Sequence, residues 1–104
     1  MARRERRRYL ALKVKSEEPL NGRTVVDAVE ASVQRLFGEY GASQANLKLI
    51  EYVPQNNQLV IRCSNKTLEK VRAAVTSTIE INGKIATIHV IGVSGTIKAL
   101  SKKT

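Results

Sequence analysis

Arginine is the residue type whose spacing in this sequence most clearly indicates a chemistry. Residues 1–8 contain five arginines against one acid, Glu5, and residues 98–104 contain three lysines and no acid. Guanidinium groups match the geometry of phosphate oxygens, and clustered cations bind polyanions by releasing condensed counterions. The two ends therefore predict binding to nucleic acid, which is favoured over an anionic membrane surface; the alternative is a pair of solvated tails. The candidate RNA-binding residues at the ends are Arg3, Arg4, Arg6, Arg7, Arg8, Lys98, Lys102 and Lys103.

Residues for metal or acid–base catalysis are few. Cys63 is the one cysteine and His89 the one histidine, which excludes an internal disulfide and a cysteine-based zinc cluster. Cys63 shares a strand face with apolar residues, and His89 lies inside an apolar strand with no carboxylate beside it in the sequence. We expect both to be structural, and the sequence predicts no catalytic residue and no metal site.

The segment Gly92–Lys98, with the sequence GVSGTIK, is the other unusual stretch. Two glycines around small hydroxyl residues permit close backbone approach and leave amide N–H groups free for an anion. The alternative is a bulged strand end before a short polar tail, and the sequence favours neither interpretation. The candidate RNA-binding residues in this segment are Ser94, Gly95, Thr96 and Lys98.

Six elements must position these residues. Alternation predicts strands over residues 9–15, 47–53, 59–64 and 85–93, and Asn82-Gly83 predicts a turn before the last of them. Between them, 3.6-residue periodicity predicts two helices: one starting near Asn21–Thr24 and stopping around Gly38 and Gly41, the other capped by Ser64 or Asn65. The residues expected to face the core from the helices are Val26, Val29, Val33, Leu36, Phe37, Leu68, Val71, Val75 and Ile79.

The order β-α-β-β-α-β predicts an α/β two-layer sandwich of the α+β class. Right-handed crossovers place both helices on one face of a four-stranded antiparallel sheet, as in ferredoxin-like and RNA-recognition-like domains. With 104 residues and 42% hydrophobic content, the chain supports one core. We therefore expect a basic flexible tail over residues 1–8, a single domain over 9–98 and a basic carboxyl-terminal tail over 99–104.

The sheet lacks the aromatic residues on which RNA-recognition modules stack bases. The predicted third strand has none, and the first offers only Tyr9. The same face instead carries Lys13, Lys15 and Arg62, which suit phosphates, so we expect RNA to be bound through its backbone and shape.

The last predicted strand is apolar on both faces, more than a two-layer sandwich needs. Excess apolar surface commonly marks an interface, so Ile91 and Val93 are the predicted contacts with a protein partner. No apolar run approaches the roughly 18 residues of a membrane span, and no signal-peptide core follows the basic start. A cytoplasmic protein that does not associate with membranes is therefore expected.

The sequence resembles the archaeal members of the Pop5/Rpp14 family of ribonuclease P proteins. The resemblance covers residues 9–98 and is most specific in VSGTIK, residues 93–98. It extends to Ile61–Cys63, to AAVT at residues 73–76 and to LFGEYG at residues 36–41.

This resemblance implies a noncatalytic RNA-binding subunit of ribonuclease P, which removes the 5′ leader from precursor tRNA. In that family the RNA is the catalyst and holds Mg²⁺, and the protein itself binds no cofactor. The implied partners are ribonuclease P RNA, precursor tRNA and a TIM-barrel-like protein subunit, with a possible homodimer inside a heterotetramer. The alternatives are a free-standing ribosomal or other structured-RNA-binding module, and a small metabolic regulator that dimerises through its sheet.

Overall fold

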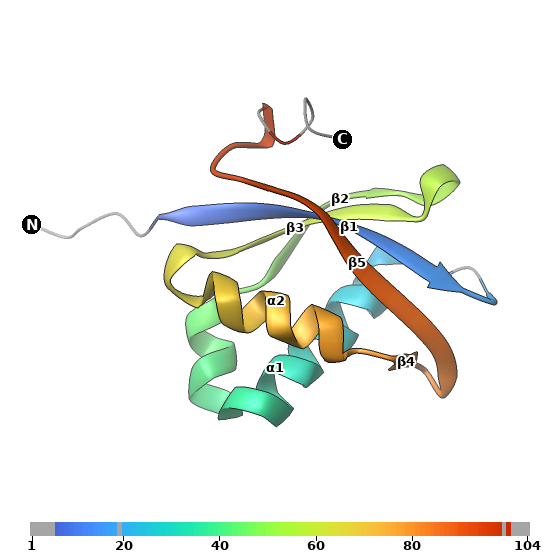
Figure 1. Ribbon diagram of the computed structural model, residues 1–104, viewed down its shortest axis with the longest axis horizontal. Helices are drawn as coiled ribbons and strands as arrows, with labels where there is room; N and C mark the ends of the chain where they lie inside the picture. Colours follow the sequence, from blue (N-terminus) through green and yellow to red (C-terminus); the bar gives the residue numbers. More distant parts are fainter. Residues whose placement is uncertain (1–5, 19, 99, 101–104) are drawn as a thin grey trace, which may run out of the picture.

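The computed structural model describes residues 6–18, 20–98 and 100 as a sheet with two α-helices on one face (Figure 1). The strands are antiparallel to their neighbours and lie in the order β2-β3-β1-β5-β4. No helix in this part of the chain is long and apolar enough to cross a membrane. The elements are β1 Arg7–Ser16, α1 Gly22–Ala45, β2 Lys48–Val53, a 3₁₀ turn Pro54–Asn56, β3 Gln58–Ser64, a second 3₁₀ turn Asn65–Thr67, α2 Leu68–Ser77, β4 Glu80–Ile81 and β5 Lys84–Ser94.

The predicted α+β class is confirmed, but the sheet has five strands rather than the predicted four. The additional strand is β4, which has two residues and pairs Glu80 with Ile85. It forms because Asn82 and Gly83 both adopt positive φ angles, of 53° and 77°, as a tight two-residue hairpin requires. The predicted turn is therefore a hairpin that adds a short edge strand.

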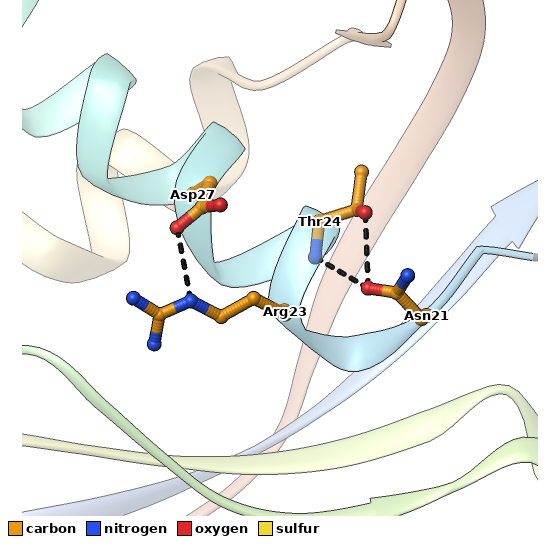
Figure 2. A network of polar contacts seen from close by, with 4 residues as sticks. All are labelled: Asn21, Arg23, Thr24 and Asp27. Carbon is orange, nitrogen blue, oxygen red and sulfur yellow. Dashed lines mark hydrogen bonds and ion pairs between the residues drawn. The ribbon is translucent and has the colours of Figure 1, made fainter.

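Helix α1 begins where the sequence predicts. Asn21 precedes the helix in extended conformation, and its Oδ1 accepts hydrogen bonds from the Thr24 backbone N–H at 2.8 Å and the Thr24 hydroxyl at 2.9 Å (Figure 2). This satisfies one of the amide groups that a helix leaves unpaired at its start. In the same first turns of the helix, Arg23 Nε lies 3.5 Å from Oδ1 of Asp27, four residues later. Both side chains are mostly exposed, so this ion pair contributes little stability.

The end of α1 differs from the prediction. The helix continues to Ala45, with a kink at Gly38, where φ is 79° and ψ is 176°. Only glycine adopts this conformation readily. Leu36 and Phe37, predicted to face the core, are 45% and 36% exposed and lie directly before the kink, whereas Ala42 and Ala45 after it are buried.

The core lies between the sheet and the two helices. Every second residue of β1 and β3 points into it, and the valines of α1 and α2 pack against them. Cys63 is buried in this cluster, as predicted, whereas Ile79 follows the end of α2 and is 67% exposed rather than part of its apolar stripe. The main contributors are Leu10, Leu12, Val14, Val25, Val26, Val29, Val33, Leu59, Ile61, Cys63, Val71 and Val75.

A buried pair of hydroxyl groups joins the two helices. Thr78 Oγ1 donates to the Ala74 carbonyl at 2.8 Å and lies 2.7 Å from Ser32 Oγ of α1. Both side chains are at most 4% exposed. Because the Thr78 hydroxyl donates its proton to Ala74, the Ser32 hydroxyl donates to Thr78 Oγ1, and this is the hydrogen bond that satisfies the buried Ser32 hydroxyl.

We expect Thr78→Val to lower the free energy of unfolding by about 1–3 kcal/mol, because it leaves the Ser32 hydroxyl buried without that partner. The matched control is Thr76→Val, which removes an exposed hydroxyl that donates to the Arg72 carbonyl and should change stability by less than about 0.5 kcal/mol. Urea unfolding of both variants measures the difference. Equal losses would show that the buried pair has no special role.

Candidate nucleic-acid interface

Arg8 connects two parts of the candidate site that are far apart in sequence. Its Nε donates a 2.7 Å hydrogen bond to Asn65 Oδ1, and the Asn65 backbone N–H donates to the Arg6 carbonyl at 2.8 Å. The Arg8 Nη1 atom also lies 3.6 Å from the point that a Cβ on Gly95 would occupy. The amino-terminal arginines and the segment after β5 therefore lie at the same end of the molecule.

Strand pairing brings further cations to this end. The core-facing residues of β1 alternate with Tyr9, Lys13 and Lys15, so these lie on the face opposite the helices. Tyr9 is opposite both Arg62 of β3 and Ser94 of β5, and Arg62 is opposite Lys48 of β2. We call the set Arg6, Arg7, Arg8, Lys48, Arg62, Gly95, Thr96 and Lys98 the basic end.

The sheet does not bring all the predicted cations together. Lys13 is opposite His89, and Lys15 is opposite Thr87. Lys13 is four positions after Tyr9 in β1, which is about 13 Å along a strand. Lys13 and Lys15 thus form a separate pair on the same face, at a distance that a nucleic-acid backbone can bridge.

The cations of the basic end have no acidic partner among the described residues. The ion pairs in this part of the chain are Arg23 with Asp27 and Lys84 with Glu18, and none of these residues belongs to the basic end. Arg6 and Arg7 are exposed, and Arg8 is partly buried. Their charges are therefore available to an external polyanion.

In the segment after β5, one of the amide groups that could bind an anion already has a partner. The Thr96 backbone N–H donates to Ser94 Oγ at 3.3 Å, so this amide is not free for a ligand. The Leu100 N–H donates to the Thr96 carbonyl at 3.2 Å, as in a helical turn. Lys98 is exposed, and it remains the residue of this segment that best suits a phosphate.

The same segment covers part of the face opposite the helices. After β5 the chain turns back over the sheet (Figure 1). Leu100 is 2% exposed and Ala11 on that face is 4% exposed, although neither belongs to the main core cluster. Both residues are therefore buried outside the main core cluster. The predicted site residues Arg3, Arg4, Lys102 and Lys103 lie outside the described residues.

Cys63 lies in the core, where its thiol is a poor nucleophile. Its side chain is 1% exposed, and burial raises the pKa of its thiol to about 11. The thiol is therefore protonated and unreactive near neutral pH. Among the described residues, no group of three or more histidine, cysteine, aspartate or glutamate side chains could hold a metal ion.

The two residues predicted to contact a protein partner differ in exposure. Val93 is partly buried and packs against the core, whereas Ile91 is 37% exposed. Ile91 is the additional residue of a β-bulge, since Ala11 is opposite Gly92 while Leu12 is opposite Val90. Ile85 is 78% exposed, so the strand is not covered on both faces.

Comparison with known proteins matches this chain to a protein family. Residues 8–104 match the model of the Rpp14/Pop5 family. Relatives named "Ribonuclease P protein component 2" include one from Methanosarcina mazei, 36% identical over 96% of this chain and 84% of that protein. Another, from Pyrococcus furiosus, is 37% identical over 96% of this chain and 83% of that protein.

The fold has a counterpart in a solved structure. A chain of the cryo-EM structure of yeast ribonuclease MRP superimposes with a TM-score of 0.72 over 92% of this chain and 79% of that chain. The two are 11% identical, so this likeness concerns the fold alone. The family match, which starts at Arg8 and includes most of the basic end, and the sequence relatives together show that the chain belongs to the Rpp14/Pop5 family.

Proposed function

We propose that this protein is a noncatalytic RNA-binding subunit of ribonuclease P that supports the catalytic RNA in removing the 5′ leader from precursor tRNA. The observation that carries the proposal is the basic end, where strand pairing brings cations of β1, β2 and β3 to one end of the sheet and Arg8 lies beside Gly95, without acidic partners among the described residues. The relatives named as ribonuclease P protein component 2 give that surface its context.

The basic end binds RNA through phosphates rather than bases. Its cations can each neutralise one phosphate, and Tyr9 is the one aromatic side chain that β1 and β3 place beside them. A single partly buried tyrosine cannot provide the stacking platform that sequence-specific modules use. Affinity should therefore depend strongly on salt and weakly on base sequence.

The proposal also covers the partners of the protein, its location and the metal ions. RNA and protein partners follow from membership of a ribonucleoprotein, and we propose the TIM-barrel-like subunit as the protein partner and the cytoplasm as the location. The Mg²⁺ ions belong to the RNA in this proposal.

We expect Lys98→Ala to reduce cleavage by the reconstituted particle more than it reduces RNA binding. One lost phosphate contact changes the salt slope of binding by roughly one unit or less. If Lys98 positions the RNA, single-turnover cleavage with saturated RNA should fall by a further factor of about ten. The matched control is Lys84→Ala, which removes a lysine paired with Glu18 outside the basic end. Equal losses of binding and cleavage would show that Lys98 is one more surface charge.

The experiment that tests the proposed function is recovery of the tagged chain together with its RNA. One abundant structured RNA, in material that cleaves precursor tRNA, is the expected result. Ribosomal RNA would support the free-standing RNA-binding module instead. Recovery of no RNA would contradict both.

A further inference from the structure

The two edges of the sheet differ in how they are protected against pairing with another strand. Proteins commonly protect an edge by short length, charged residues, bulges or proline. The β2 edge has all of these, with Lys48 and Glu51 in a six-residue strand, a register shift at Ile50 and Pro54 directly after it. The β5 edge is the longer one and is covered by β4 only at its start.

The exposed part of the β5 edge presents unpaired backbone groups. The Ala86 N–H donates to the Ile79 carbonyl, so Ala86 turns its backbone groups away from β1. Alternate residues of a strand turn the same way, so Ile88 and Val90 also direct their N–H and C=O groups outward. Strand β4 has ended by then, and among the described residues no strand pairs with this stretch. The bulge at Ile91 limits the regular edge to residues 86–90.

A groove runs beside this stretch, between the edge and α2. It has a volume of about 300 Å³, and Arg72 and Ile79 lie along it. Ile79 is 67% exposed, which is unusual for a large apolar residue beside the core. The groove has a guanidinium, an imidazole and several hydroxyl groups but no carboxylate. Its lining residues are Arg72, Thr76, Thr78, Ile79, Thr87, Ile88, His89 and Val90.

We propose that this edge pairs with an extended, acidic segment of another protein subunit, which adds a strand to the sheet beside Ile88 and Val90. Backbone hydrogen bonds to the edge would supply affinity, and alternate side chains of the added strand would enter the groove. One of these side chains would be apolar and pack on Ile79, while a carboxylate would meet Arg72. This inference depends on the proposed function only for the source of the partner.

The charges favour such a partner over a second copy of this chain. Edge-to-edge pairing of two copies would bring two chains of net charge +9 together. It would also supply a second Arg72 and no carboxylate from the groove to pair with it, since a symmetric contact presents the same groups from both copies. An acidic segment is attracted rather than repelled, because its negative charge complements both the groove and the net positive charge of the whole molecule.

The test is amide hydrogen exchange in the complete chain, alone and in the particle reconstituted with the other ribonuclease P proteins and the RNA. The Ile88 and Val90 amides should exchange at least about tenfold more slowly in the particle, because the added strand accepts hydrogen bonds from them. The Thr87 and His89 amides point toward β1 and serve as internal controls, whose exchange should change little.

Each alternative occupant predicts a different pattern. Protection by RNA without the other proteins would mean that RNA covers the edge, and concentration-dependent protection in the free chain would mean that a second copy does. Either result, or unchanged exchange in an assembled particle, would overturn the proposal. A particle that does not assemble at all would instead contradict the proposed function.

A charge reversal provides a second readout that does not depend on exchange rates. Arg72→Glu should weaken binding to the partner subunit about tenfold or more, because the acidic segment would then face a carboxylate. Arg35→Glu, at an exposed position of α1 outside this groove, is the matched control and should bind normally. Equal binding of the two variants would remove Arg72 from the interface.

Discussion

Replacing four arginines of the amino-terminal run by glutamine should weaken RNA binding roughly a thousandfold at about 0.1 M salt, if each contacts a phosphate. Each lost contact also flattens the slope of log affinity against log salt by about 0.7–0.9 units, so four contacts amount to roughly three units. The substituted residues are Arg3, Arg4, Arg6 and Arg7.

The structure dictates the form of this variant. Deleting residues 1–8 would remove the start of β1, which begins at Arg7, and the Arg8 side chain that holds Asn65. Glutamine substitution with Arg8 retained removes charge but keeps the backbone pairing. A matched control replaces four cations outside the basic end by glutamine. These are Arg23, Arg35, Lys70 and Lys84.

Both variants lower the net charge of the protein by the same amount, so a comparison separates local contact from overall attraction. The control should lose a small part of the affinity and keep most of the slope, because exposed charges beyond a Debye length are screened. Binding to a structured RNA, measured across a salt series, gives both quantities. Parallel salt dependences for the two variants would mean that the amino-terminal arginines act only through net charge.

The sequence predicts the core well because burial imposes a regular period. Leu10, Leu12 and Val14 alternate in β1 and are buried, and the α1 valines lie on the predicted stripe. The predictions fail where the helix bends. Leu36 and Phe37 continue the helical period, but they lie directly before the kink at Gly38 and their side chains are exposed. Periodicity does not show where a helix changes direction.

Short elements and hydrogen-bond partners are equally difficult to predict. Strand β4 has two residues, too few for alternation to be recognised, although Asn82-Gly83 is a hairpin signal that could have indicated it. One of the two interpretations of the GVSGTIK segment leaves its amide groups free, but the Thr96 amide donates to the hydroxyl two residues earlier. Such local bonds by serine are common in turns and depend on backbone geometry that composition does not determine.

In the candidate site, too, the sequence predicts some residues and misses others. The sequence identifies the cations at its two ends and Arg62, but Lys48 is missed because its place opposite Arg62 depends on strand register. The role of Asn65 is also missed, since a residue expected to cap α2 instead accepts a hydrogen bond from Arg8. Contacts between β1, the β3–α2 junction and the segment after β5 are tertiary, and no local pattern encodes them.

The second large effect concerns catalysis itself. The basic end is suited to holding phosphates, and the buried thiol of Cys63, with its pKa raised to about 11, offers no nucleophile near neutral pH. We therefore expect the purified chain to cleave no precursor tRNA, while the RNA-containing particle recovered with it cleaves at the 5′ leader. Destroying the RNA should abolish this activity, and restoring the RNA should recover it.

The most direct test of the central claim is cleavage of precursor tRNA by the particle recovered with the tagged chain, measured before and after digestion of its RNA. The proposed function predicts 5′-leader removal before digestion, none after it, and recovery when ribonuclease P RNA is added back. Cleavage that survives complete digestion of the RNA, and that one substitution in this chain abolishes, would contradict the account.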